Sequence, residues 1–427
     1  MISFSEAQNS IRILCEDWLK DQPPTSERVP LIEGLGRYLT EDLVAPLDLP
    51  LNDVSAMDGY ALCAQENDLP ITVSQRYTVI GESRAGLPYA GRPLVPDECI
   101  RIFTGAMVPQ SSDTVVIQEN VSLIEADLIE IQASADVGSN IRRQGEEICK
   151  GAYLARAGEQ MTPNKVPLLA SQGLADVTVR RRLRVAIFAT GDELKEPGQT
   201  LGAGDIFESN RLSIHAVLHQ YPVELIDLGV IEDTPEAIAA CLRAAALAAD
   251  LVISSGGVSV GDYDFVRSCV ESMGALTHYK VAMKPGKPVC FGHLDRGDGG
   301  RALFFGLPGN AVSSFVVMTE LYLPVIQLLI TGKDVGYPAQ QLAVVDADIK
   351  RRPGRLEFQR GVLRREVTDS SKPQWRVSAF SSQDSHRVMG LAQANCTIRI
   401  PADVEHIRAG AEVMVSIFPW CDGVEWV

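Results

Sequence analysis

Residues 251–264 have the sequence LVISSGGVSVGDYD, in which a short, fully apolar run, Leu251–Ile253, leads directly into a glycine-rich segment. Two further apolar runs, Val185–Phe188 and Ala302–Phe305, also end in turns that contain glycine. Apolar runs of this length, bounded by such turns, are typical of strands that are buried on both faces.

The segments between these strands are predicted to be helical. One helix begins at Thr234-Pro235-Glu236, which supplies an N-cap, a proline in the first turn and an early acid, and it continues through an alanine-rich stretch to Ala249. Buried strands that alternate with helices indicate a parallel sheet covered on both faces. Residues 181–332 are therefore predicted to form an α/β domain.

The sequence on either side of this segment has a different pattern. Residues 3–20 have helical periodicity, and Ser5 is the expected N-cap. Short β-rich runs, broken by Gly and Pro, dominate residues 71–131, and residues 335–427 are also β-patterned. The predicted fold class is thus a multidomain α/β plus β protein. Smaller predicted elements are helical character at 33–39, a loop at 140–151 and a short helix at 164–174.

The composition narrows the possible functions. The chain has 427 residues, 46% of them hydrophobic, which is enough for several cores. Lys plus Arg number 39 against 55 Asp plus Glu, and the net charge of −16 argues against nonspecific nucleic-acid binding and against docking on anionic membranes. The nine cysteines form no CxxC pair, which favours reduced thiols and a cytoplasmic protein.

The sequence contains no segment that we predict to be a secretory signal or a membrane span. The N-terminal residues Met1–Glu6 contain no basic segment followed by an apolar one, so no secretory signal is predicted. The most apolar stretch, Val312–Ile330, contains Glu320 and Pro324 and is expected to be a buried helix.

Polar residues follow each predicted strand. In an open α/β sheet, ligands bind beyond the carboxyl ends of the strands, and glycine lets the backbone approach a ligand closely. The segments ATGDEL at 189–194, SSGGVSVGDYD at 254–264 and GLPGN at 306–310 therefore predict a phosphate and metal site. Two carboxylates in these turns have alternative roles: Asp264 is also a candidate N-cap, and Glu193 is also a candidate first-turn acid.

Two other segments carry candidate functional residues. The run KVAMKPGKP at 280–288 places three lysines in a stiff loop, which suits a fixed cationic site, although a solvated surface is the alternative. Upstream, NDVSAMDGYA at 52–61 surrounds one acid and one aromatic residue with small residues, and neither strand nor helix periodicity explains it.

Taken together, these segments resemble the molybdopterin molybdenumtransferase family, whose members are related to the C-terminal domain of gephyrin. The resemblance covers nearly the whole chain, and its motifs occur in the family's order. The matching segments are SAMDGYAL (55–62), RIFTGAMVP (101–109), NIRRQGEEI (140–148), ATGDEL (189–194), SSGGVSVGDYDFV (254–266), KVAMKPGKPVCFG (280–292) and GLPGNAVSS (306–314).

The resemblance implies a reaction in which adenylylated molybdopterin and molybdate give molybdenum cofactor and AMP, with a divalent cation such as Mg²⁺. It also implies a homodimer with four subdomains per chain. These are an elongated linking subdomain, a β-rich subdomain, an α/β molybdopterin-binding subdomain and a C-terminal, barrel-like β subdomain. Their expected boundaries are 1–45 with 140–180, 46–139, 181–332 and 333–427.

Site residues are carried over from the family by position. The expected catalytic residues are Asp58, Thr104, Glu193 and Asp264. The expected substrate-binding residues are Lys280, Lys284, Ser254, Gly256, Gly257, Pro308, Gly309, Asn310, Arg360 and Ser385. The expected metal ligands are Glu147, Glu193, Asp233 and Asp264. The sequence departs from the family at Glu147, where Asp is frequent, and at Asn310-Ala311, where Asn-Pro is usual.

Two other functions share the same motifs. The SSGGxSxGxxD and GLPGN elements also occur in the adenylyltransferase that acts one step earlier, which would use ATP. A scaffold protein of the gephyrin type is a further alternative. The SAMDGYA segment and the β-rich flanking domains favour the molybdenum-inserting branch.

Overall fold

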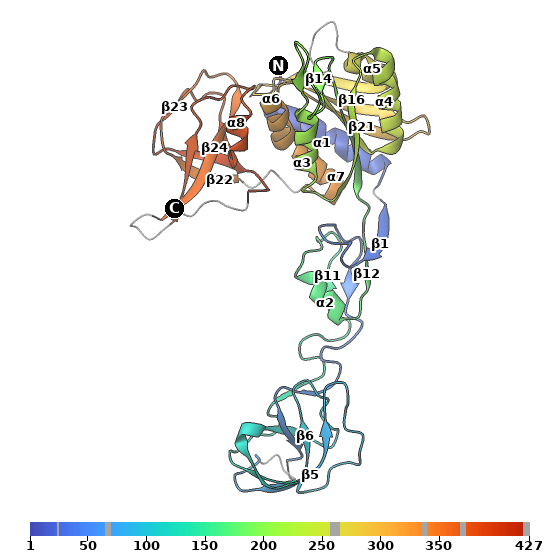
Figure 1. The fold of residues 1–427 in the computed structure, drawn as a ribbon, viewed down its shortest axis with the longest axis vertical. Coiled ribbons are helices and arrows are strands. Elements are labelled where there is room, and N and C mark those ends of the chain that lie inside the picture. Colours follow the sequence, from blue (N-terminus) through green and yellow to red (C-terminus); the bar gives the residue numbers. More distant parts are fainter. Residues whose placement is uncertain (24, 65–69, 257–264, 335–339, 368–372, 422–427) are drawn as a thin grey trace. The chain divides into compact units, whose positions relative to one another are not determined.

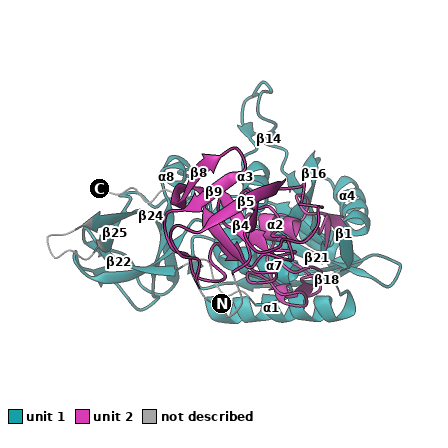
Figure 2. Ribbon diagram, turned by 90° about the horizontal axis from the view of Figure 1, so that it is seen from below, with its two compact units in different colours: residues 1–28, 36–38, 178–427 teal, residues 29–35, 39–177 magenta. Residues whose placement is uncertain are grey.

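The computed structural model describes residues 1–427 apart from 24, 65–69, 257–264, 335–339, 368–372 and 422–427. The described chain divides into two compact units, coloured in Figure 2. Unit 1 contains residues 1–28, 36–38 and 178–427, and unit 2 contains residues 29–35 and 39–177. Strands β1 (Ser26–Pro30) and β12 (Asp176–Arg180) each contain a boundary between the units.

A six-stranded sheet forms the centre of the α/β part of unit 1. All three predicted apolar runs are strands of it, and it is mixed where a parallel sheet was expected. Its first four strands are parallel, and its fifth strand runs antiparallel to both of its neighbours, with Lys280 opposite Pro288 in the last pair. The order is β16 (Val223–Ile231), β13 (Leu183–Thr190), β17 (Leu251–Ser255), β21 (Arg301–Leu307), β20 (Pro288–Asp295) and β18 (Gly274–Lys280).

Helices cover both faces of this sheet, as the sequence predicts (Figure 1). One face packs against α4 (Pro235–Ala248) and α5 (Phe265–Met273). The predicted cap of α4 is confirmed, since the Thr234 side chain accepts a hydrogen bond from the Ala237 backbone. Helices on the other face are α1 (Phe4–Asp21), α3 (Asn210–Leu218), α6 (Ala311–Val317), the π-helical turn η2 (Met318–Tyr322) and α7 (Leu323–Thr331).

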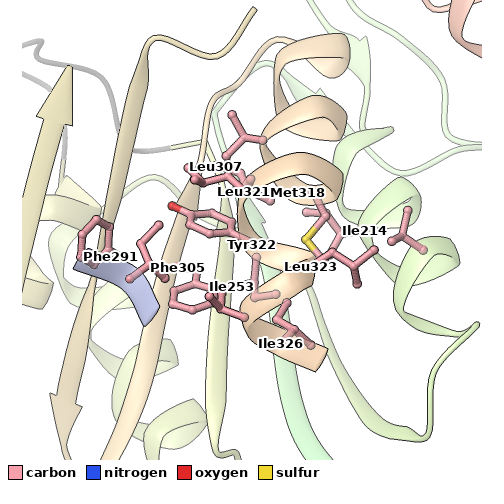
Figure 3. Close-up of a cluster of buried hydrophobic side chains, with 14 of the residues drawn as sticks. Ile214, Ile253, Phe291, Phe305, Leu307, Met318, Leu321, Tyr322, Leu323 and Ile326 are labelled. Carbon is pink, nitrogen blue, oxygen red and sulfur yellow. The ribbon is translucent and has the colours of Figure 1, made fainter. Parts of the chain in front are cut away.

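Tyr322 links the η2 turn to the sheet within the hydrophobic core formed between the sheet and the helices α1, α3, α6 and α7 (Figure 3). Its ring stacks on Phe305 with a centroid distance of 4.5 Å. Its hydroxyl donates to backbone carbonyls of the two neighbouring strands, at 2.7 Å from Cys290 O and 3.0 Å from Gly306 O. Because the buried hydroxyl is hydrogen-bonded, the aromatic ring can occupy the core without an unpaired polar atom.

The long apolar segment predicted to be a buried helix is confirmed as one. Residues Ala311–Thr331 are long and apolar enough to cross a membrane by composition alone, but 89% of the most apolar window is buried inside the protein. The segment therefore packs as a core helix of unit 1.

Two helix predictions near the N-terminus are wrong. The N-cap of α1 is Ser3 and not Ser5, because Ser3 and Glu6 form a capping box: Glu6 N lies 3.2 Å from Ser3 Oγ, and Ser3 N lies 2.7 Å from Glu6 Oε2. Residues 33–39 form turns and not a helix. Gly36 has a φ of 77°, a left-handed conformation that interrupts helical geometry there.

The C-terminal part of unit 1 is a closed β-barrel, which confirms the barrel-like prediction. Its sheet closes because β24 pairs with both β25 and β26. The strand order is β19 (Met283–Lys284), β24 (Leu356–Val367), β25 (Pro373–Ala379), β22 (Gln340–Val345), β28 (Glu412–Ile417) and β26 (Cys396–Ile400). Strand β19 lies within the α/β segment of the sequence, but it pairs with β24 of the barrel. The lysine-containing turn that includes Lys284 is therefore attached to the barrel sheet.

Shorter elements complete unit 1. They are β14 (Leu194–Lys195), β15 (Ile206–Phe207), β23 (Ile349–Lys350), β27 (His406–Ile407) and α8 (Met389–Ala392).

Unit 2 is β-rich, as predicted. Its largest sheet has the order β7 (Thr114–Ile117), β4 (Gly59–Leu62), β6 (Glu98–Ile102), β5 (Arg76–Ser83), β9 (Leu128–Ile131) and β8 (Val121–Glu125). The predicted helix at 164–174 is confirmed as α2 (Lys165–Ser171). The remaining elements are β2 (Leu43–Val44), β3 (Val54–Ser55), β10 (Ile141–Arg142), β11 (Tyr153–Ala155) and the 3₁₀ turn η1 (Gln118–Asn120). The subdomain boundaries stay a prediction.

Glu320 is a buried carboxyl where the η2 turn meets the barrel. It is 1% exposed, and it accepts hydrogen bonds from the hydroxyls of Thr397 and Ser416. Burial raises the pKa of Glu320, while the two hydroxyl hydrogen bonds and the charge of Arg399 oppose that shift. The carboxyl is therefore easier to protonate in the folded protein than in the unfolded chain.

We expect Glu320→Gln to raise the melting temperature at neutral pH. Because the pKa of Glu320 is higher in the folded state, the folded protein binds more protons, and its free energy of unfolding falls as the pH rises above the ordinary glutamate pKa of 4.5. The neutral amide removes that penalty, so the gain should shrink toward about pH 4. Thermal unfolding between these pH values measures the effect, with the exposed Glu271→Gln as control. A lower melting temperature at every pH would contradict it.

Candidate functional site

The carboxyl ends of three parallel strands open onto a cavity of about 1580 Å³ in unit 1. Residues just after β13, β17 and β21 line it, so the three predicted glycine-rich turns do meet at one sheet edge as far as they are described. Gly256 is required there: its φ is 86°, and a Cβ would lie 3.0 Å from the Thr190 carbonyl oxygen. The barrel supplies much of the remaining lining, from residues 347–359 and 379–388.

The described residues that line the cavity carry charges of both signs. Among them are six carboxylates and five Lys or Arg side chains. The carboxylates are Glu193, Glu208, Asp233, Asp348, Glu357 and Asp384. The cations are Lys284, Lys287, Lys350, Arg351 and Arg355. All five cations come from the β19 turn or from the barrel, and three of the carboxylates come from the α/β part. The cavity is thus suited to hold an anion and a cation together.

Two predicted acids, Glu193 and Asp233, line the cavity. Asp233 Oδ1 accepts a hydrogen bond from Thr190 Oγ1 at 3.0 Å. The Glu193 carboxylate lies over Gly191, where a Cβ would be 2.8 Å from Glu193 Oε2. Within the described ranges, no group of three or more His, Cys, Asp or Glu is placed to hold a metal. Two carboxylates fit Mg²⁺, which is usually bound by one or two carboxylates together with substrate phosphates and water.

The predicted lysine pair is divided by the fold. Lys284 lines the cavity, and its Nζ lies 2.9 Å from Glu357 Oε1. Lys280 ends β18 and is exposed, but it is absent from the described lining of the cavity. The two lysines lie on different elements, because the chain leaves β18 at Lys280 and enters the barrel sheet at Met283. Lys287, from the same turn, lines the cavity instead.

The predicted serine at the end of β17 is off by one residue. Ser254 is fully buried, and its Oγ donates to Gly256 O at 3.4 Å. Ser255 lines the cavity in its place, because successive side chains of a strand point in opposite directions, and the predicted Gly256 lines it as well. Pro308, Gly309 and Asn310 all line the cavity.

Arg360 is a framework residue of the loop that carries Ser385. It is 1% exposed, and its guanidinium donates to backbone carbonyls of Ser382, Asp384 and Arg387 and to Gln383 Oε1. It is not among the described residues that line the cavity, whereas Ser385 is. Burial lowers the pKa of Arg360 from its usual value. The geometry indicates that Arg360 shapes this wall of the cavity.

Replacing Arg360 should therefore affect the loop and the stability of unit 1. We expect Arg360→Lys to lower the free energy of unfolding by about 2 kcal/mol, because a lysine cannot satisfy the carbonyls that the planar guanidinium holds. Faster proteolysis within residues 381–387 should accompany the loss. The half-exposed Arg365→Lys is the control. Unchanged stability and unchanged proteolysis would show that Arg360 does not hold the loop.

Three predicted residues belong to unit 2. Asp58 and Thr104 are brought together, since both the backbone N and the Oγ1 of Thr104 lie 2.8 Å from Asp58 Oδ1. These hydrogen bonds lower the pKa of Asp58, with a smaller contribution from Arg101. Glu147 is exposed in the segment between β10 and β11. Gly257 and Asp264, also predicted, lie outside the described residues.

Several lining residues were missed by the sequence analysis. The barrel residues Lys350, Arg351, Arg355 and Glu357 contribute charge to the cavity, but no glycine-rich turn or strand end marks them in the sequence. Glu208, 2% exposed, lies in the segment between β15 and α3. The only available signal was the density of Arg residues at 351–360 in an acidic chain.

Matches along the chain identify the class of protein. Residues 2–173 match the "MoeA N-terminal region (domain I and II)", residues 186–328 a "Probable molybdopterin binding domain", and residues 343–418 the "MoeA C-terminal region (domain IV)". The fold agrees: a molybdopterin biosynthesis MoeA protein from Pyrococcus horikosii has a TM-score of 0.80 at 27% identity, over 98% of this chain and 99% of that one.

Relatives with curated names specify the family. A molybdopterin molybdenumtransferase from Haemophilus influenzae is 37% identical over 396 residues, which are 93% of this chain and 95% of the relative. Molybdopterin molybdenumtransferase 2 from Mycobacterium tuberculosis is 32% identical over 418 residues, 96% of this chain and 98% of the relative. The chain belongs to the molybdopterin molybdenumtransferase family, transferases of molybdenum cofactor biosynthesis, which confirms the resemblance seen in the sequence.

Proposed function

We propose that this protein inserts molybdenum from molybdate into adenylylated molybdopterin and releases AMP. The observation that carries the proposal is the cavity at the carboxyl edge of the sheet, where glycine-rich turns, carboxylates and lysines line one space. A pyrophosphate-linked substrate and an oxyanion both need cations and close backbone approach, and the cavity offers both. The family match over nearly the whole chain supports the same reaction.

The cationic wall of the cavity would hold the anions. Lys284 and Lys287 present ammonium groups, which are compact point charges that bind an oxyanion without a planar geometry. Pro308, Gly309 and Asn310 of the GLPGN turn border the same space. Holding molybdate and the pterin substrate in one cavity makes the insertion step effectively unimolecular, which is a large source of rate acceleration.

The carboxylate wall would hold Mg²⁺. Glu193 and Asp233, which line the cavity, are the residues proposed as ligands. The family resemblance also assigns metal binding to Glu147, which belongs to unit 2, and to Asp264, which lies outside the described residues. When bound, Mg²⁺ would polarise the phosphoanhydride and stabilise the AMP that leaves. Thr190 orients the Asp233 carboxylate through its hydrogen bond, so that carboxylate does not need to be reorganised when a cation arrives.

We also propose a homodimer and a cytoplasmic location. The dimer rests on the family resemblance. The location is supported by the nine cysteines, all of which are free thiols in the structure.

The reaction is tested by supplying the two candidate substrate pairs separately. Adenylylated molybdopterin plus molybdate should yield AMP and molybdenum cofactor, and chelation of divalent cations should stop the reaction. Molybdopterin plus ATP should yield no adenylylated product. The reverse result would show the preceding adenylyl transfer, and no turnover with either pair would favour a scaffold protein.

A further inference from the structure

Lys284 and Glu357 form an ion pair that joins the cavity lysine to the barrel. Lys284 Nζ lies 2.9 Å from Glu357 Oε1. The two residues are also register partners, because β19 pairs in parallel with β24 and Lys284 lies opposite Glu357. Both line the cavity, but their exposure differs: the Lys284 side chain is 47% exposed, and the Glu357 side chain is 3% exposed.

The buried partner of this pair is fixed from several sides. Gln359 Nε2 donates to Glu357 Oε1 at 3.2 Å, and Arg351 Nη1 donates to Glu357 Oε2 at 3.3 Å. Arg351 is itself 3% exposed and is anchored on backbone carbonyls. Those carbonyls belong to Arg355, Pro401, Ala402 and Val404. These contacts fix the position of the Glu357 carboxylate. The flexible Lys284 side chain must therefore adopt the conformation that brings its ammonium group to Glu357.

We propose that Glu357 is a positioning residue, which holds the Lys284 ammonium against the cavity wall and so makes anion binding depend on the C-terminal barrel. The proposal rests on the proposed function only in taking molybdate as the anion. Lysine has a flexible four-carbon stem, and an ammonium that is already held in place loses less conformational freedom when the anion binds. One of its three N–H groups donates to Glu357, which leaves donors for a ligand.

Charge balance favours positioning over simple neutralisation. Arg351, Glu357 and Lys284 together carry one net positive charge, so the carboxylate is already compensated by the buried arginine before Lys284 is counted. A neutralising carboxylate would weaken anion binding, and its removal would strengthen it. A positioning carboxylate has the opposite effect when it is removed.

The test is a double-mutant cycle on molybdate binding, measured by calorimetry with molybdate alone. We expect Lys284→Ala to weaken binding about tenfold, the loss of one charge-assisted hydrogen bond. Glu357→Ala should weaken it severalfold, and Glu357→Gln, which keeps an acceptor, should weaken it less. The double variant Lys284→Ala/Glu357→Ala should bind no worse than Lys284→Ala alone, because Glu357 acts through the lysine. Tighter binding in Glu357→Ala, or additive losses, would overturn the proposal.

A second readout keeps the proposal testable if wild type binds no molybdate, a result that would count against the proposed function. The rate of Lys284 modification by an amine-reactive reagent, followed by mass spectrometry, should rise in Glu357→Ala, because the hydrogen bond no longer restrains the amine. Asp346→Asn is the matched control: this carboxylate pairs with Arg364 and Arg376 in the same barrel and is absent from the described lining. An equal Lys284 modification rate in wild type and Glu357→Ala would overturn the positioning role.

Discussion

Asp233→Asn and Glu193→Gln are each expected to lower the rate of molybdenum insertion by about two orders of magnitude or more, the usual cost of removing one group that stabilises charge in a transition state. Both amides keep the size of the side chain, and an asparagine oxygen can still accept the Thr190 hydrogen bond. Folding should therefore be preserved while the negative charge for Mg²⁺ is lost. The measurement is AMP release from adenylylated molybdopterin over a range of Mg²⁺ concentrations.

Asp192→Asn is the matched control for this pair of variants. Asp192 is the exposed neighbour of Glu193 and is not among the described lining residues, so its loss should leave turnover near wild type. A different outcome is expected if Glu193 and Asp233 only stabilise the turns: all three variants would then retain activity, and any loss would appear in the melting temperature.

Lys284→Ala is expected to weaken molybdate-dependent turnover about tenfold and to make the remaining binding less sensitive to salt. An attraction between an exposed ammonium and an oxyanion is screened by salt, and the variant lacks that attraction. Lys284→Arg should recover only part of the activity, since the guanidinium is bulkier and prefers a planar, bidentate partner. The measurement is turnover against ionic strength and molybdate concentration.

The Lys280→Ala variant distinguishes the residue roles implied by the family resemblance from those indicated by the cavity geometry. The resemblance assigns both lysines to the substrate, but the structure brings only Lys284 to the described cavity lining, so Lys280→Ala should have the smaller effect. Lys20→Ala, on the exposed side of α1, serves as the control for loss of one positive charge. If turnover depends on ionic strength equally in wild type and Lys284→Ala, Lys284 is a solvated surface cation and does not bind the anion.

The sequence by itself determined the α/β centre and most of the turns at its edge. Each apolar run became a strand, and the Thr234 cap began its helix, because strand burial and helix capping depend on a few neighbouring residues. Family motifs also marked Asp58 and Thr104 as site residues, and the structure joins these two by two hydrogen bonds. Local signals failed where glycine interrupted helical periodicity, as at Gly36.

Only the tertiary structure decided which charged residues share the cavity. Lys284 and Lys280 are four residues apart, yet the chain passes from one sheet to another between them, so strand alternation could not be extended across the gap. Glu357 lies 73 residues from Lys284 in sequence, and Arg360 faces its own loop and not the ligand space. Contacts between such distant residues arise from the closure of the barrel and its packing on the α/β core, and no short-range sequence pattern encodes them.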